Sequence, residues 1–212
     1  MKNIRHWTPR YVWARIQEIS YQRRSPNLPW LTRQANEFLA DYLRPTDIGL
    51  EFGSGRSTLW FAERVARLVS IEHDRQWHSR VLDLIEKSQQ SNIDYHLLSA
   101  DTTVANDLAI AIRTILSPLA CESFDFVLID GIQRDVCTRE ALRLLKPGGL
   151  LIIDNVNRHI PSLSYSPHSR SPEMGTESQE WEEVLKKLNQ WRKYWTSSGV
   201  TDTAFYFKPA SA

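Results

Sequence analysis

The chain has 212 residues, 42% of them apolar, and a formal net charge of +1, which allows one α/β domain with a sizeable buried core. The apolar share excludes wholesale disorder, and the small net charge excludes a global field that would attract nucleic acid or a membrane. Residues 1–7 lack an apolar signal core and no run approaches membrane-spanning length, so we expect a cytoplasmic protein without membrane insertion.

Residues 1–44 are predicted to form an N-terminal helical cap. Periodicity indicates a helix over 10–23, and Thr32 is placed to cap a second helix that runs through Leu43. Residues 1–34 interleave arginines with aromatic side chains, a pattern that suits either a nucleic-acid surface or an amphipathic helix packed on the domain. We favour packing, because no RNA-binding motif accompanies the charge.

Residues 45–212 begin with five strands that alternate with helices. We place the strands at 46–52, 68–72, 93–98, 124–129 and 150–153, and the helices between them at 57–67, 75–90, 104–117 and 134–145. The inner strands are apolar throughout, which indicates a parallel sheet covered on both faces. Right-handed crossovers bring the carboxyl ends of these strands to one edge, where ligands of open α/β sheets bind.

The alternation breaks after Asn155. Residues 156–176 contain serines, three prolines and two histidines, and a segment this long without an element of its own is typical of a lid or substrate loop. A helix is predicted over 177–192, and the last residues are typical of a hairpin with Gly199 in its connection. We expect the lid and the cap to enclose the substrate.

Acidic residues stand at or just past the carboxyl ends of all five strands: Glu51, Glu72, Asp101, Asp130 and Asp154. Packing alone does not account for five acids along one edge. The first strand also runs into a glycine-rich turn, Gly53-Ser54-Gly55, that opens a helix. Such a turn lets a ligand approach backbone N–H groups, although a tight turn without a ligand has the same pattern.

The carboxylate of Glu51 helps to choose the ligand of this turn. A dinucleotide fold would have a third glycine where Thr58 stands, and an acid two residues before Gly53 disfavours a pyrophosphate. Glu51 suits a cationic group, Glu72 suits a ribose diol, and Asp101 suits an adenine amino group. A ligand with an ammonium group, a ribose and an adenine fits all three.

These motifs resemble, in order over residues 45–155, those of class I S-adenosylmethionine-dependent methyltransferases of the catechol-type and small bacterial O-methyltransferase group. The resemblance rests on LEFGSGRST at 50–58, SIEHD at 70–74, SAD at 99–101 and LKPGGLLIID at 145–154. It implies one Rossmann-like domain with a seven-stranded, mostly parallel sheet, helices on both faces and an antiparallel C-terminal hairpin. It also implies an enzyme that binds S-adenosylmethionine.

The resemblance implies cofactor contacts for Glu51, Gly53, Ser54, Gly55, Ser57, Thr58, Glu72, His73, Asp101 and Asp130. The two glycines would let the backbone approach the methionine part, and Glu51 would lie near its amino group, directly or through water. Glu72 would hold the ribose hydroxyls, and His73 would lie beside the adenine. Helix capping and surface solvation are the alternatives for single acids, and a bystander role is the alternative for the histidine.

Asp130, Asp154 and Asn155 match positions that hold a divalent cation in the catechol-type enzymes. Two carboxylates and an amide oxygen suit Mg²⁺, which would orient the acceptor hydroxyl and lower its pKa. The lysine that serves as base in that family is missing, because residues 133–134 are Gln-Arg and arginine does not lose its proton. The remaining candidates for the base are Asp130, His159 and metal-bound hydroxide. A strand end that only caps the next loop is the alternative to a metal site.

We therefore predict a methyltransferase that moves a methyl group from S-adenosylmethionine to a hydroxyl of a small-molecule acceptor. The residues after the fourth strand lack the Asn/Asp-Pro-Pro-Tyr/Phe motif of many amine methyltransferases. An N- or RNA methyltransferase and a non-catalytic S-adenosylmethionine-binding module are the alternatives, and the acids at 130 and 154 argue against the binding module. We expect no nucleic-acid partner and leave a homo-oligomer open.

Overall fold

The computed structural model describes residues 7–99, 105–117 and 121–210. The strands are β1 (Ile48–Phe52), β2 (Arg67–Glu72), β3 (Ile93–Leu97), β4 (Phe124–Ile129), β5 (Leu145–Asp154), β6 (Arg192–Ser197) and β7 (Asp202–Phe207). The helices are α1 (Pro9–Arg24), α2 (Arg33–Tyr42), α3 (Arg56–Ala62), α4 (Arg75–Ser88), α5 (Ala105–Leu116), α6 (Arg134–Leu144) and α7 (Gln179–Leu188). Most boundaries lie within two residues of those expected from the sequence.

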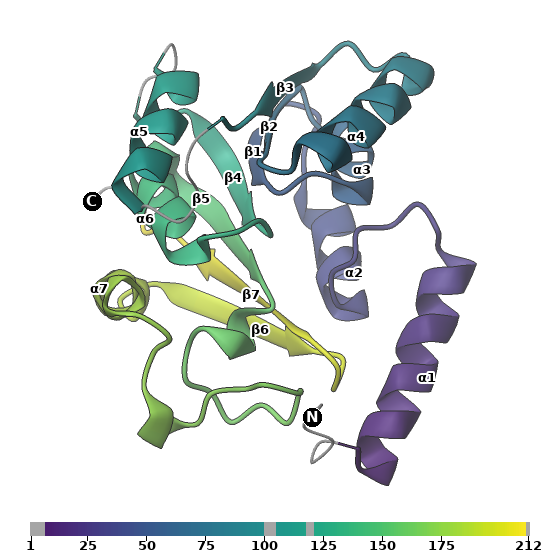
Figure 1. The fold of residues 1–212 in the computed structure, drawn as a ribbon, viewed down its shortest axis with the longest axis vertical. Coiled ribbons are helices and arrows are strands. Elements are labelled where there is room, and N and C mark those ends of the chain that lie inside the picture. The colour runs from purple at the N-terminus through teal and green to yellow at the C-terminus, as the bar shows by residue number, and fades with distance from the viewer. Residues whose placement is uncertain (1–6, 100–104, 118–120, 211–212) are drawn as a thin grey trace.

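The strands form one sheet in the order β3-β2-β1-β4-β5-β7-β6 (Figure 1). The pairs between β1, β2, β3, β4 and β5 are parallel, whereas β7 runs antiparallel to both β5 and β6. This arrangement confirms the predicted seven-stranded, mostly parallel α/β sheet with an antiparallel C-terminal hairpin. The strand order reverses direction at β1 and β4, which is where ligands of such sheets bind.

Three predicted boundaries were wrong by about one helical turn. Helix α7 ends at Leu188 rather than at 192, where β6 already begins. Helix α3 ends at Ala62 rather than at 67, because the N–H of Ala66 donates to Asp47 O at 2.9 Å and leads the chain into β2. Strand β5 begins at Leu145 rather than at 150. Leu145 pairs with Phe124 before a bulge, and the register resumes beyond it, so the Lys-Pro-Gly-Gly run lies inside the strand.

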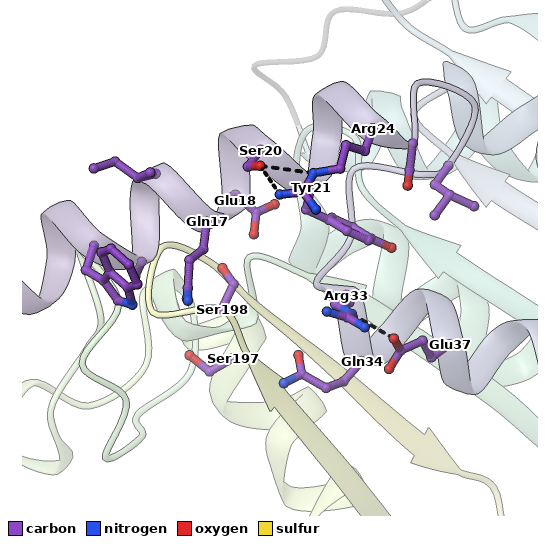
Figure 2. Close-up of a pocket in the computed structure, with 15 residues that line it drawn as sticks. Gln17, Glu18, Ser20, Tyr21, Arg24, Arg33, Gln34, Glu37, Ser197 and Ser198 are labelled. Carbon is purple, nitrogen blue, oxygen red and sulfur yellow. Dashed lines mark hydrogen bonds and ion pairs between the residues drawn. The ribbon is translucent and has the colours of Figure 1, made fainter.

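Helix α1 contacts the rest of the chain sparingly, and its one buried residue is Glu18. A cavity of about 970 Å³ lies between α1, α2 and the turn that joins β6 to β7, and Figure 2 shows residues that line it. Helix α2, in contrast, buries Ala35 and Leu39 in the apolar core that it forms with α3 on one face of the sheet. The predicted division of the chain at residue 44 stays a prediction. Among the described residues, none of the helices combines the length and apolar character that a membrane crossing requires.

The segment predicted as a lid is ordered around the buried side chain of Asn157. Its Nδ2 donates to Pro167 O at 3.2 Å and to Ser169 Oγ at 2.9 Å, and the backbone carbonyl of Asn157 accepts from the N–H of Arg170 at 2.9 Å. Two short 3₁₀ helices, Val156–Arg158 and Pro172–Met174, frame the segment. The segment is therefore a compact loop with its own hydrogen bonds.

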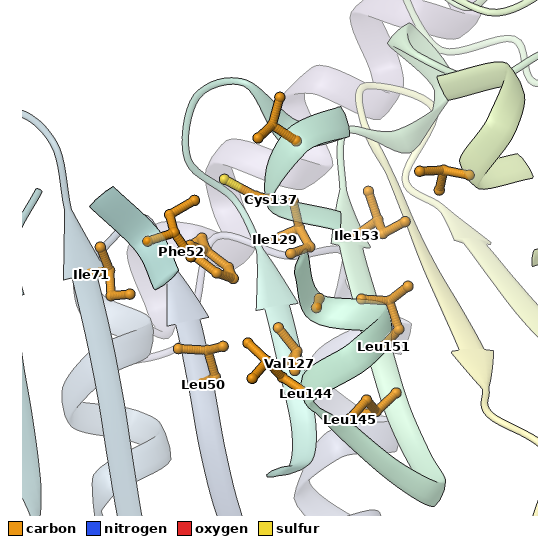
Figure 3. Close-up of a cluster of buried hydrophobic side chains, with 14 of the residues drawn as sticks. Leu50, Phe52, Ile71, Val127, Ile129, Cys137, Leu144, Leu145, Leu151 and Ile153 are labelled. Carbon is orange, nitrogen blue, oxygen red and sulfur yellow. The ribbon is translucent and has the colours of Figure 1, made fainter. Parts of the chain in front are cut away.

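Apolar side chains cover both faces of the sheet. Leu50, Val127 and Leu151 point toward α5, α6 and α7, as Figure 3 shows for the part near α6. Phe126 and Leu150, one residue along each strand, point instead toward α2 and α3. This alternation explains why the inner strands are apolar throughout.

Gly49 has no room for a side chain, because it lies opposite Phe126 and an added Cβ would come within 2.1 Å of Phe126 Cζ. We expect Gly49→Ala to lower the free energy of unfolding by about 1–3 kcal/mol, as measured by urea denaturation. Adding Phe126→Leu should recover part of the loss. Gly55→Ala is the matched control, because its Cβ would meet only Trp77, at 3.9 Å. Wild-type stability of Gly49→Ala would contradict this account.

Candidate functional site

The turn after β1 lies directly against the turn after β4. Gly53 has a φ of +92°, and a Cβ on it would lie 2.7 Å from the nitrogen of Gly131. A Cβ on Gly131 would lie 3.2 Å from the nitrogen of Gly53. The N–H of Asp130 donates to Phe52 O at 2.8 Å and joins the two strand ends. Both turns therefore need glycine, and their backbone is exposed to any ligand above them.

The carboxylate of Glu51 is buried beneath this turn. It accepts hydrogen bonds from the hydroxyls of Ser57, Thr58 at 2.6 Å and Ser70 at 2.7 Å. The Thr58 hydroxyl also accepts from the N–H of Gly55 at 3.0 Å, so Glu51 orients the first turn of α3. Burial raises the pKa of Glu51 to about 7, and the three hydroxyls oppose that rise. The contact of Glu51 with a ligand amino group stays a prediction and, from this position, needs a bridging group.

Glu72 ends β2 and faces the same turn. Its Oε2 accepts from both the N–H and the hydroxyl of Ser54, each at 3.0 Å. Its Oε1 accepts from the backbone N–H of His73 at 2.8 Å and of Asp74 at 2.9 Å. The Ser54 hydroxyl is also 2.7 Å from the hydroxyl of Tyr95. These bonds hold the carboxylate of Glu72 at the sheet edge with its orientation set mainly by backbone donors.

A cavity of about 560 Å³ opens above these residues, a volume typical of small-molecule sites. Its lining includes seven of the residues predicted to bind the cofactor: Gly53, Ser54, Gly55, Ser57, Glu72, His73 and Asp130. Glu51 and Thr58 lie below it, and Asp101 falls outside the described residues. The lining is completed by Trp30, Arg56, Asp74, Trp77, Gly131 and Ile132, which the sequence interpretation missed.

Trp77 and Trp30 form two walls of this cavity. Trp77 lies in the first turn of α4, and its Nε1 donates to Ser54 O at 2.8 Å. Trp77 follows the helix cap Asp74 by three residues, so the sequence could have placed it in the first turn of α4, next to the strand end at Glu72. Trp30 comes from the loop before α2, where the guanidinium of Arg56 lies 4.9 Å from the centre of its ring. No local pattern predicts that contact, because it depends on how the loop folds over α3.

Asp130 follows β4 at the cavity wall and is neutralised by Arg134. Arg134 Nη2 donates to Asp130 Oδ1 at 2.9 Å and to Asp130 O at 3.1 Å, and its Nε donates to Gly131 O at 2.9 Å. Its Nη1 donates to Asp154 O. Burial raises the pKa of Asp130, and the guanidinium of Arg134 opposes the rise. The Arg134 side chain is 13% exposed and that of Asp130 is 31% exposed, so this ion pair is partly buried at the cavity wall.

The predicted Mg²⁺ ligands, Asp130, Asp154 and Asn155, do not form a metal site. Asp154 Oδ1 accepts from Thr203 at 2.8 Å, and its Oδ2 accepts from Asn155 Nδ2 at 2.6 Å. Asn155 thus presents its amide N–H to a carboxylate, and Asp130 is paired with a guanidinium. Among the described residues, no group of three His, Cys, Asp or Glu side chains is arranged to hold a metal ion. The residues present therefore do not fit Mg²⁺.

His159, the second candidate base, is not among the residues that line the cavity. Its ring stacks on Trp181 at a centroid separation of 5.5 Å, and its Nδ1 forms a hydrogen bond with Glu177. Burial lowers the pKa of His159, and Glu177 opposes this effect. The structure does not bring the two predicted catalytic residues, Asp130 and His159, together at this cavity.

The cap and the lid meet at a further cavity of about 820 Å³. Arg10 and Trp13 of α1 line one side, and Leu163 and Tyr165 of the lid line another. The guanidinium of Arg10 lies 4.4 Å from the centre of the Tyr165 ring. The turn between β6 and β7 borders both this cavity and the one in Figure 2. Enclosure of a substrate by the cap and the lid stays a prediction.

Comparison with known proteins gives a family match at this site. The model of a family described as a methyltransferase domain matches residues 50–156, from the end of β1 to the first residue after Asn155. A catechol O-methyltransferase of Niastella koreensis is 33% identical over 116 residues. That alignment covers 51% of this chain and 49% of the relative, so the chain spans about half the length of that protein.

Solved structures share the fold at low sequence identity. An rRNA methylase from Streptococcus thermophilus superposes with a TM-score of 0.56 at 12% identity, over 83% of this chain and 95% of that one. Aeropyrum pernix fibrillarin, solved with natively bound S-adenosyl-L-methionine, has a TM-score of 0.52 at 16% identity, over 77% of this chain and 67% of its own. At these identities the two structures support the fold alone.

The buried carboxyl of Glu51 should make stability depend on pH. Its pKa is about 7 in the folded protein against 4.5 ordinarily, so between these values the folded protein holds a proton that the unfolded chain releases. The contribution of Glu51 to the free energy of unfolding therefore falls as pH rises from 4.5 to 7 and is flat above. Relative to Glu51→Gln, the wild type should lose about 2 kcal/mol between pH 5 and pH 8.

Denaturant titrations of both proteins at the two pH values measure this difference. Glu63→Gln is the control, because the Glu63 side chain is 59% exposed. Parallel pH profiles for the wild type and Glu51→Gln would contradict the raised pKa.

Proposed function

This chain belongs to the methyltransferase domain family, and we propose that it transfers a methyl group from S-adenosylmethionine to a hydroxyl oxygen of a small-molecule acceptor. Its family and its fold are those of a class I S-adenosylmethionine-dependent methyltransferase. The main observation in favour of an oxygen acceptor is the position of Asp130. Its carboxylate lies on the cavity wall directly beside the turn at Gly53. The 33% identity to a catechol O-methyltransferase adds support.

The methionine part of the cofactor would lie against the turn Gly53–Gly55. Backbone there is accessible because Gly53 and Gly131 carry no side chains, and α3 begins at Arg56, so N–H groups face the ligand. The ribose would lie over Glu72. The Ser54 hydroxyl and the His73 ring, which contact that carboxylate, can rotate away when ribose hydroxyls arrive, whereas the backbone donors stay in place.

The adenine would lie between His73 and Trp77, the two aromatic side chains that continue from Glu72 along the cavity wall. A large flat indole held by a hydrogen bond to Ser54 O suits a stacked base. The expected contact of Asp101 with the adenine amino group belongs to the same proposal.

Methyl transfer to oxygen is an in-line displacement at the sulfonium methyl. The acceptor oxygen forms the new C–O bond as the S–CH₃ bond breaks, and its electrons stay on sulfur, which leaves as neutral S-adenosylhomocysteine. The hydroxyl proton must leave during this step, and Asp130 is the carboxylate at the cavity wall that can accept it. Its pairing with Arg134 fixes the orientation of the carboxylate for this role.

An RNA acceptor is the main enzymatic alternative, favoured by the arginines of α1. The cavity argues against it, because the carboxylates of Glu72 and Asp74 line it and would repel phosphates. Binding of RNA by this protein would be strongly salt-dependent. A module that binds the cofactor without catalysis would have no use for a carboxylate at the acceptor side.

Calorimetry with S-adenosylhomocysteine tests the cofactor site. We expect Glu72→Gln to weaken binding about 10- to 100-fold, because hydrogen bonds from ribose hydroxyls to a charged acceptor are lost. Gln keeps the shape of the side chain, so unfolding is a smaller concern than with Ala. Glu86→Gln on α4 is the control. Failure of the wild type to bind would refute the proposed site.

Incubation with labelled S-adenosylmethionine tests the acceptor class, with catechol as the first probe and metabolite extracts as the second. Label should appear on oxygen of a small molecule. Asp130→Asn should then lower kcat about 100-fold or more, because Asn still accepts from Arg134 but takes no proton. Label found on nitrogen or on RNA, or an unchanged kcat for Asp130→Asn, would contradict the proposal.

A further inference from the structure

The guanidinium of Arg134 contacts the side chain of Asp130, one of the three side chains on which the resemblance to catechol-type enzymes predicts a divalent cation. Four of its five N–H groups donate hydrogen bonds, to Asp130 Oδ1 and to the carbonyl oxygens of Asp130, Gly131 and Asp154. These acceptors come from the ends of two neighbouring parallel strands, β4 and β5. One planar cation therefore joins the strand ends on which the metal ligands were expected.

A positive charge is needed at this position because two carboxylates lie close to it. Asp154 is 3% exposed, and the side chain of Asp130, after the adjacent strand, is 31% exposed. A buried carboxylate is repelled by a second carboxylate beside it, and removal of their counter-charge is destabilising. Arg134, itself 13% exposed, is the cation that the described residues place between the two strand ends.

The other two expected ligands, Asp154 and Asn155, form hydrogen bonds with residues of the C-terminal hairpin. Asp154 accepts from Thr203 of β7 and from Asn155, and Asn155 Nδ2 also donates to Thr201 Oγ1 at 2.6 Å. Recruitment of Asp154 and Asn155 by a metal would break three hydrogen bonds and displace a buried guanidinium.

We infer that Arg134 is the resident cation of the acceptor site and takes the place of a divalent metal, so that methyl transfer needs no added metal ion. The catalytic part of this inference rests on the proposed function, whereas the replacement of the cation is a property of the protein without substrate. Arg134 is a positioning residue. It keeps its proton, holds Asp130 at the cavity wall and leaves Asp130 to accept the proton of the acceptor hydroxyl.

The test is a titration with Mn²⁺ of the wild type, Arg134→Ala and Arg134→Lys, with free Mn²⁺ followed by electron paramagnetic resonance and Tm measured in parallel. The wild type should show no saturable binding, and EDTA should change neither its Tm nor its turnover. Arg134→Ala removes the cation and leaves space beside Asp130, so it should gain about one Mn²⁺ site. At about ten times the Kd, Mn²⁺ should raise its Tm by about 3–5 °C.

Arg134→Lys is the matched control, because it keeps a positive charge and should not respond to Mn²⁺. Adding Asp130→Asn to Arg134→Ala should abolish the gained site, which a merely structural role of Arg134 would not predict. Stoichiometric Mn²⁺ binding by the wild type, or turnover lost with EDTA and restored by Mg²⁺, would overturn the inference. So would a folded Arg134→Ala protein that ignores Mn²⁺. If Arg134→Ala does not fold, the wild-type titration decides, and the Mn²⁺ binding and Tm measurements do not depend on the methyl-transfer assay that tests the proposed function.

Discussion

The burial of carboxylates at the carboxyl ends of parallel strands is the constraint on which this sheet edge depends. A buried carboxylate must find hydrogen-bond donors or a counter-charge, because leaving it alone costs several kcal/mol. Glu51 has three side-chain hydroxyls, Glu72 has mainly backbone N–H groups, and Asp130 has a guanidinium. Each solution fixes the backbone around it, and together they shape the turns that line the cavity.

Glu51 and Glu72 differ in the kind of hydrogen-bond donor around them and in their position relative to the cavity. Hydroxyls from Ser57, Thr58 and Ser70 surround Glu51 and hold it beneath the turn, where it orients the start of α3. Backbone donors approach Glu72 from within the chain and leave its carboxylate on the cavity wall. The two acids come from neighbouring strands, yet one supports the turn from below and the other faces the ligand space.

Sequence patterns predicted the sheet because each strand end was marked by residues close to it in the chain. The apolar strands, the glycine-rich turn and the helix cap Asp74 are signals of this kind.

The sequence patterns failed where contacts with a distant segment determine the structure. Apolar residues continue past Ala62, so the periodicity predicts a longer helix. It gives no sign of the hydrogen bond from Ala66 to Asp47 that leads the chain away from α3. Trp30 reaches the cavity through a loop. The Lys-Pro-Gly-Gly run stays in β5 as a bulge, where Gly148 and Gly149 exchange backbone hydrogen bonds with Lys208, the residue after β7.

The metal ligands expected from the sequence, Asp130, Asp154 and Asn155, form a ligand set only when the position near them is free. Replacing the family's lysine by Arg134 changes more than the base. A lysine side chain presents one compact charge and can release its proton, whereas guanidinium keeps its charge and spans several acceptors in one plane. Here that plane bridges two strand ends and occupies the space between them. In the proposed enzyme, the shared fold and the ordered motifs would place the methyl donor, and a single side chain at the start of α6 would decide by what means the acceptor is activated.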